Sequence, residues 1–121
     1  MGLFDVTNAA LEVALHGSEM RQAAISNNLA NANTPGFAPS DVSFESALQS
    51  ALASSPDDPA AVASVEPTST VATGVMRVDG SGVDVDRESA DLAKTQIVFD
   101  AAMAIDTSRL HTLSQLITSA H

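Results

Sequence analysis

All five prolines of this 121-residue chain lie between residues 35 and 67, which leaves two long terminal stretches free of the strongest helix breaker. Both stretches place apolar residues three and four positions apart, the period of one face of an α-helix. We therefore expect an N-terminal helix over residues 1–34 and a C-terminal helix over 86–121. Residues 35–85 would form a turn, a short helix and a flexible acidic segment rich in Pro, Ser and Ala.

The N-terminal stretch has two neighbouring rows at helical spacing. The first row contains Phe4, Leu11, Leu15, Ser18, Gln22, Ile25, Leu29 and Ala32. The second row contains Leu3, Val6, Ala10, Val13, Gly17, Met20 and Ala24. Together the two rows are wider than contact with a single helix requires, so this helix should need neighbours on more than one side.

The C-terminal stretch repeats the pattern at successive heptad positions. These positions hold Leu92, Gln96, Phe99, Met103, Asp106, Leu110, Leu113, Ile117 and Ala120. Acidic residues just before this row suit the start of a helix, where carboxylates cap free N–H groups, and we expect the start near Asp86 within Asp84, Asp86, Arg87 and Glu88. Two helices of similar length predict a mainly α fold, an antiparallel coiled-coil-like hairpin.

The middle of the chain gives weaker signals. Asp41 to Ala53 is predicted to be a short amphipathic helix that carries Phe44, Leu48 and Leu52. Ser, Ala, Pro and Asp dominate residues 54–69, which we expect to be mobile. The Val-rich stretch from Thr70 to Asp79 suggests a short strand or one arm of a hairpin.

Charge and composition exclude several functions. Fifteen acidic and five basic residues give a net charge of −10, which disfavours binding to nucleic acid or anionic lipid. The chain contains no cysteine and no apolar run long enough for membrane insertion. Asp5, Asn8 and Glu12 interrupt the first 15 residues, so we expect no cleavable secretory signal.

The sequence offers few candidates for chemistry. The acidic cluster from Asp79 to Asp91 has the oxygen ligands that calcium prefers, but its spacing does not fit a calcium-binding loop. His16, His111 and His121 are too scattered to form a ligand set. No Ser occupies the context of an activated nucleophile. We expect no catalytic residue, no bound metal and no cofactor, and hence no enzyme.

The end of the first helix carries the most informative local motif, formed by Asn27, Asn31, Thr34, Pro35, Gly36 and Phe37. One interpretation is a simple stop signal, because Asn tolerates helix ends and Pro-Gly suits a type II turn. That interpretation leaves Asn27 and Asn31 unexplained, since both lower helix propensity on one face. The alternative that we favour is that their side chains bond to a partner.

At this motif the chain resembles the flagellar basal-body rod proteins, whose first helix ends in a pattern close to Asn-x-x-Asn-x-x-Thr-Pro-Gly-aromatic. The stretches Asp41–Glu45 and Val83–Glu88 are also similar to that family, the second to its proximal-rod type. The resemblance implies a non-enzymatic subunit of the periplasmic drive shaft that transmits torque. It also implies delivery by the flagellar type III export apparatus without a cleaved signal.

The same resemblance implies partners: further copies of this chain, FlgC and other rod proteins, the basal-body adaptor FliE, and the export gate or MS ring at the rod base. Apolar residues of both terminal helices would form the interfaces. We assign to them Leu11, Leu15, Ile25, Leu29, Leu92, Phe99, Met103, Leu110, Leu113 and Ile117.

Two other classes compete with a rod subunit. The acidic charge and the heptads also fit a soluble coiled-coil adaptor or a secretion chaperone, which would be a stable dimer in dilute solution. A small metal-dependent enzyme would rest on the acidic cluster alone.

Overall fold

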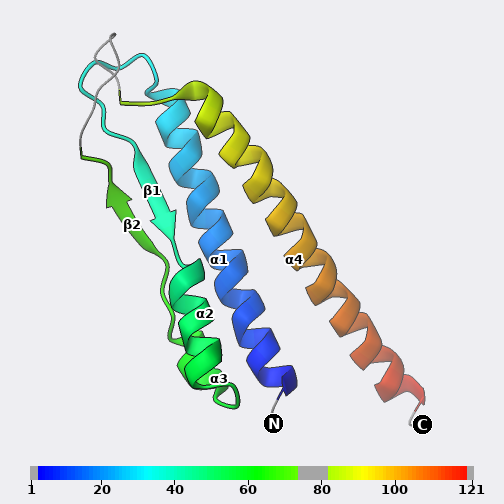
Figure 1. Cartoon of the computed structure of the whole chain (residues 1–121). Coiled ribbons are helices and arrows are strands. Elements are labelled where there is room, and N and C mark those ends of the chain that lie inside the picture. The colour runs from blue at the N-terminus through cyan, green and yellow to red at the C-terminus, as the bar shows by residue number, and fades with distance from the viewer. Residues whose placement is uncertain (1–2, 74–81, 120–121) are drawn as a thin grey trace.

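The computed structural model describes residues 3–73 and 82–119. Two long antiparallel helices dominate it, as expected for a mainly α hairpin, and Figure 1 shows them side by side. In chain order the elements are α1 (Leu3–Ala30), β1 (Ser40–Ser43), α2 (Glu45–Ser54), α3 (Pro59–Ala63), β2 (Thr68–Val71) and α4 (Val85–Ser119).

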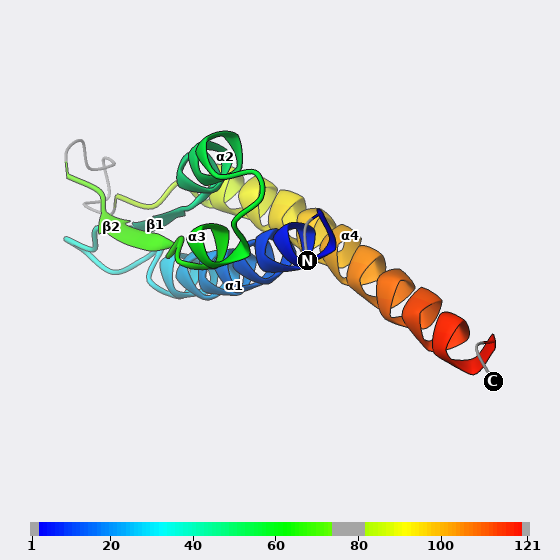
Figure 2. The same cartoon turned by 90° about the horizontal axis from the view of Figure 1, so that it is seen from below.

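The chain forms three layers with α1 in the centre. On one side of α1 lies α4, and on the other lies the middle segment with its two short helices and two strands (Figure 1). The strands β1 and β2 pair antiparallel, with Ser40 opposite Val71 and Ser43 opposite Thr68. Figure 2 shows that the C-terminal part of α4 projects beyond the other layers. No helix within residues 3–73 and 82–119 is long and apolar enough to cross a membrane.

The middle segment contains more regular structure than expected. The predicted helix from Asp41 begins four residues later, because Val42 and Phe44 are buried while Asp41 and Ser43 are exposed. Burial of alternate residues is the period of a strand, and β1 ends just before the α2 helix starts. The tertiary packing of these two side chains therefore overrides the helical interpretation of this stretch.

The stretch expected to be mobile, 54–69, contains α3 and the start of β2. Asp58 caps α3 by accepting hydrogen bonds from Ala60 and Ala61, and Pro59 occupies the first turn. The strand expected from Thr70 instead begins at Thr68, and the rest of that prediction, residues 74–79, lies outside the described residues.

The core lies between α1 and the middle segment. Near the start of α1, Val6 and Ala9 pack with the fully buried Val62 of α3. Further along α1, Val13 packs with Val42 and Phe44. The second apolar row of α1 is therefore covered by the chain itself from Val6 to Ala24.

Gly17 allows this packing to be close. A Cβ atom at position 17 would lie 2.3 Å from Cδ1 of Phe44, well inside van der Waals contact. The Phe44 ring thus sits against the bare backbone of α1, and only glycine fits beneath it.

Candidate assembly surface

The first half of α4 closes against α1. The Gln22 side chain donates a hydrogen bond of 2.8 Å to Gln96, and both residues belong to the rows predicted from the sequence. Thr95 and Ala102 of α4 and Ser18 of α1 are buried. Because these residues are small, the two helices can approach closely along this seam.

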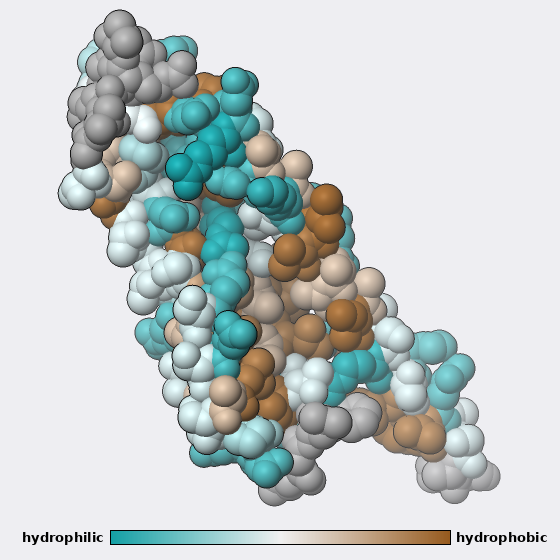
Figure 3. Space-filling model, viewed as in Figure 1, coloured by the Kyte–Doolittle hydropathy of each residue, from teal (hydrophilic) through white to brown (hydrophobic). Residues whose placement is uncertain are grey.

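From Ile97 onward, α4 has many exposed apolar side chains. Ile97 is 69% exposed, Leu110 is 61% exposed and Ile117 is 65% exposed. In all, eight large apolar residues of α4 are exposed between residues 97 and 117: Ile97, Val98, Met103, Ile105, Leu110, Leu113, Leu116 and Ile117. Figure 3 shows hydrophobic surface along α4 and in the space between α4 and α1. We call this set of eight the open face of α4.

The last turns of the open face are notable for their lack of charge. From Leu110 to Ser119 the helix contains no Asp, Glu, Lys or Arg. A solvated helix normally carries charged residues on the face that meets water, and a contiguous apolar patch on a small protein marks an interaction site. The last turns of α4 are therefore suited to contact with other protein surfaces.

The residues predicted as interfaces separate into two groups. Ile25 is buried, and Leu11, Leu15, Leu29, Leu92 and Phe99 are half-buried, so these residues belong mainly to the internal packing. Met103, Leu110, Leu113 and Ile117 are exposed on α4. The exposed large apolar residues are therefore concentrated on α4, because the middle segment packs on the second row of α1.

Asn28 is the polar residue that joins the three layers, and it is not among the site residues predicted from the sequence. Its side chain is fully buried. The amide donates to the Ser40 carbonyl at 2.8 Å and to Glu88 Oε2 at 3.1 Å, and its Oδ1 accepts from the Ser40 N–H at 2.9 Å. One side chain thus connects α1, the start of β1 and the first turn of α4.

Two signals in the sequence could have found Asn28. It follows the buried Ile25 by three residues, which places both on one face of a helix. The family pattern also requires two residues between its asparagines, and counting back from Asn31 reaches Asn28. The assignment of the first asparagine of the pattern to Asn27 was one residue out of register, and Asn27 has an exposed side chain.

The rest of the motif closes the end of α1 locally. Asn31 donates to the Asn27 carbonyl at 2.9 Å and accepts a bond from the Thr34 hydroxyl at 3.2 Å. The Phe37 N–H donates to the Thr34 carbonyl across Pro35 and Gly36, and Gly36 has a φ of 78°. A positive φ at this position is what a type II turn requires. The turn is therefore as the sequence predicts.

The start of α4 also agrees with the sequence. Asp84 accepts a hydrogen bond of 3.2 Å from the Arg87 N–H, as a helix cap does. Arg87 and Asp91 form an exposed ion pair at 3.8 Å, Asp86 is exposed, and Glu88 is the residue that Asn28 reaches.

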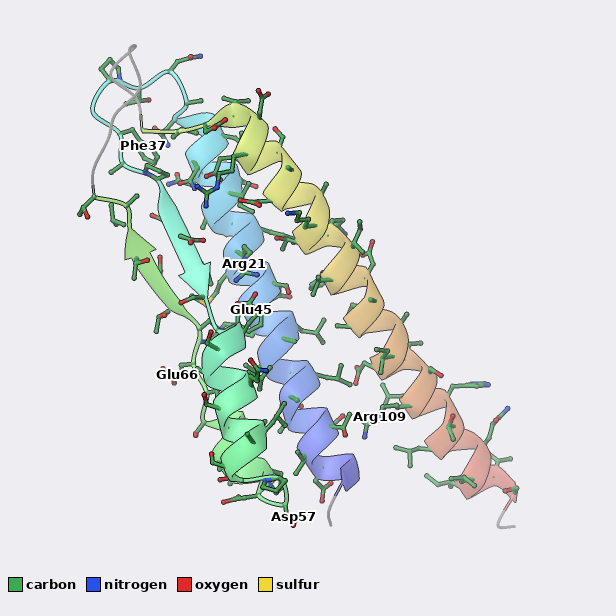
Figure 4. All side chains as sticks on the ribbon, viewed as in Figure 1. Arg21, Phe37, Glu45, Asp57, Glu66 and Arg109 are labelled. Atoms are coloured by element: carbon green, nitrogen blue, oxygen red, sulfur yellow. The ribbon has the colours of Figure 1, made fainter. Side chains whose placement is uncertain are left out.

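Arg21 holds the junction of β1 and α2 against α1. Its guanidinium pairs with both carboxylate oxygens of Glu45 and donates to the Val42 carbonyl at 2.6 Å from Nη2. It also lies 5.0 Å from the centroid of the Phe44 ring. Figure 4 shows Arg21 and Glu45 pointing toward one another. The hydrogen bonds from Arg21 lower the pKa of Glu45 from 4.5 to about 2.

The residues that could carry chemistry are scattered over the described structure. Residues 3–73 and 82–119 contain no group of three or more His, Cys, Asp or Glu that could hold a metal ion, while Asp79 and His121 lie outside them. A groove of about 550 Å³ lies between α1, β1 and α4, and acidic and basic side chains line it. A smaller groove beside α1 contains His16 with Glu12 and Glu66. Neither groove contains a cysteine, and His111 is exposed on α4.

A helical hairpin with one self-covered helix and one helix that exposes apolar residues suits a subunit that packs against neighbours. The comparisons with known proteins agree. The family model for flagella basal body rod proteins matches residues 12–37, from the middle of α1 to Phe37. That range includes Arg21, Asn28 and the whole turn motif.

Two curated relatives extend the match along the chain. The flagellar basal body rod protein FlgB of Bacillus subtilis (strain 168) is 32% identical over 126 aligned positions, which cover 98% of each chain. FlgB of Aeromonas hydrophila is 28% identical over 117 positions, which cover 88% of this chain and 89% of that protein. The chain belongs to the flagellar basal-body rod protein family, as a structural subunit of the FlgB type.

Proposed function

We propose that this rod subunit assembles through the open face of α4, which packs against neighbouring subunits to build the tubular proximal rod. The observation that supports the proposal is the exposure of eight large apolar residues on α4, a helix that the chain covers on one side only. Burying each Leu or Ile is worth roughly 1.5–3 kcal/mol, so assembly would gain several kcal/mol that the free chain lacks.

The two apolar surfaces that meet in the assembly need not be the same. Contact between unlike surfaces does not close on itself and generates an open helical tube. Such a tube would transmit torque across the periplasm as a non-enzymatic drive shaft. FlgC and other rod proteins, FliE, and the export gate or MS ring are the neighbours that we propose at its two ends and along its length.

Export through the flagellar type III apparatus, without a cleaved signal, fits the same proposal. An open apolar helix stabilises the free chain little, so the free chain should unfold readily for passage through a narrow channel. Full stability would then follow only after delivery, when neighbours cover α4.

The experiment places a charge on the open face. We expect Leu113→Glu to abolish rod assembly and motility in a flagellated host that lacks its own copy, because an unpaired carboxylate would be buried in the interface. Gln115→Glu adds the same charge to an exposed polar position of α4 and is the matched control. Normal motility of the Leu113→Glu strain would reject the proposal.

The same variants separate a rod subunit from a soluble adaptor or chaperone. An adaptor would cover its open face in a stable dimer, so sedimentation at micromolar concentration would show a dimer that Leu113→Glu dissociates. A rod subunit should sediment as a monomer, with helicity unchanged by the substitution because Leu113 is exposed.

A further inference from the structure

The two edges of the small sheet differ in how their backbone groups are satisfied. On the edge of β1 that faces α1, Asn28 bonds both the N–H and the carbonyl of Ser40. Arg21 bonds the Val42 carbonyl, and the Asp41 side chain accepts from the Val42 N–H at 2.9 Å. Every outward backbone group of Ser40 and Val42 therefore has a partner.

The outward groups of β2 follow from the same register. In an antiparallel pair, backbone groups point alternately toward and away from the partner strand. The backbone N–H and C=O groups of Ser40 and Val42 point away from β2. The backbone groups of the residues opposite them, Val71 and Ser69, therefore point away from β1. The bond from Ala72 N–H to the Pro39 carbonyl, 2.8 Å, agrees with this alternation.

The outer edge of β2 is open. Within residues 3–73 and 82–119, the backbone groups of Ser69 and Val71 have no hydrogen-bond partner, and Val71 is 62% exposed. Natural edge strands are commonly protected by Lys, Pro, a bulge or short length; β2 is short, at four residues, but its sequence Thr-Ser-Thr-Val contains no Lys or Pro and its pairing with β1 has no bulge. An unprotected edge of β-branched residues is a template for a further strand.

Charge indicates which strand would fit. Residues 38–73 contain five acidic residues and no Lys or Arg. A second copy of this layer would be repelled by the first, whereas a basic segment would be attracted. We propose that the edge of β2 receives an extended segment rich in Lys or Arg from a different protein chain, by strand addition.

This surface is separate from the open face of α4, because β2 and α4 lie on opposite sides of α1 (Figure 1). The inference rests on the proposed assembly role for its setting, but the two can fail independently. If Leu113→Glu blocks assembly and β2 edge variants do not, strand addition is wrong and the role of α4 stands. The reverse result would reject the role of α4 and keep strand addition.

The first test removes an outward N–H from the edge. Val71→Pro deletes that donor and leaves the inward groups of Thr70 paired with β1, so the free protein should keep its circular-dichroism spectrum and melting temperature. In a flagellated host that lacks its own copy of the protein, we expect about tenfold fewer completed rods, because the added strand would lose one hydrogen bond and its close contact with β2. Val71→Thr keeps the N–H and is the control. If Val71→Pro unfolds the protein, Ser69→Pro tests the same edge, and normal rod assembly by a folded variant would overturn the proposal.

The second test identifies the occupant. The chain contains no cysteine, so Val71→Cys introduces a single thiol. In isolated basal bodies, a reagent that links a thiol to an amine should join position 71 to a Lys in an extended segment of a different chain. A link only to a second copy of this chain would overturn the assignment. So would the absence of any link at position 71 when basal bodies that carry Leu113→Cys, prepared and treated in parallel, do react.

Discussion

The two long helices have similar apolar spacing, yet the chain covers α1 on two sides and α4 on one. The difference lies in the connection between them. Residues 40–71 run back along α1 and pack Val42, Phe44 and Val62 against it, while no described segment returns along the outer side of α4. An apolar row in the sequence thus shows that a partner is needed, and the path of the chain decides whether that partner is internal.

The residues on the two helices fit this difference. Where α1 meets the middle segment it presents small residues, such as Ala9, Ala10 and Gly17, against which larger side chains pack. The open face of α4 presents Leu, Ile, Val and Met instead. Large apolar residues that remain exposed are available to fill grooves on other subunits.

The largest effect on the self-covered side should come from Asn28. Asn28→Ala removes three hydrogen bonds that join α1, β1 and α4, and leaves both backbone groups of Ser40 without their buried partner. We expect the free energy of unfolding to fall by about 3 kcal/mol. Urea unfolding followed by circular dichroism would measure the loss.

The neighbouring Asn27 provides the matched control. Its side chain is exposed, so Asn27→Ala should change the free energy of unfolding by no more than about 0.5 kcal/mol. Equal losses for the two asparagines would show that helix propensity near the end of α1, rather than the buried amide, governs stability here.

A somewhat smaller effect is expected at Gly17. Alanine would normally stabilise a helix by up to about 1 kcal/mol, but here its Cβ would overlap the Phe44 ring. We expect Gly17→Ala to destabilise the protein by about 2 kcal/mol, because the ring must leave its site. Thermal unfolding of the purified protein would measure this.

A double mutant tests the cause of that loss. Phe44→Ala removes the ring, so in that background Gly17→Ala should be neutral or stabilising. If Gly17→Ala costs the same with and without the ring, the contact between these two residues does not explain the glycine.

Much of the fold could be predicted from the sequence because it depends on local rules. Helical spacing located α1 and α4, the acidic residues around Asp86 marked the start of α4 to within a residue, and Pro35-Gly36 marked the turn. The short elements between them could not be located as well. β1 depends on burial of Val42 and Phe44 against α1, and β2 depends on pairing with β1, so both are set by distant contacts.

The sequence indicates which apolar residues line α4, but not which of them are exposed. The heptad row named Met103, Leu110, Leu113 and Ile117, which are exposed, together with Leu92 and Phe99, which are half-buried. No local pattern distinguishes these two groups, because the difference depends on where α4 diverges from α1 (Figure 2). Asn28 shares a helix face with Ile25 and occupies the first asparagine position of the family pattern, but neither signal shows that its side chain bonds to Ser40 and Glu88.

The smallest expected effect on stability comes from the ion pair between Arg21 and Glu45, and it tells the contribution of this pair from that of the apolar packing between the middle segment and α1. Because Arg21 lowers the pKa of Glu45 from 4.5 to about 2, this pair stabilises the folded state above pH 4.5, and its contribution is lost as the pH falls toward 2. Glu45 is 57% exposed, so solvent screens the pair and the contribution should stay below about 1 kcal/mol. Glu45→Gln should therefore lower the free energy of unfolding at pH 7 by that small amount and flatten the dependence of this free energy on pH between 4.5 and 2.

The control is Glu66→Gln, which removes the same charge from an exposed loop residue of this layer that does not bond Arg21. This variant should keep the wild-type slope. An unchanged slope in Glu45→Gln would mean that packing of Phe44 over Gly17, without the ion pair, holds the middle segment on α1.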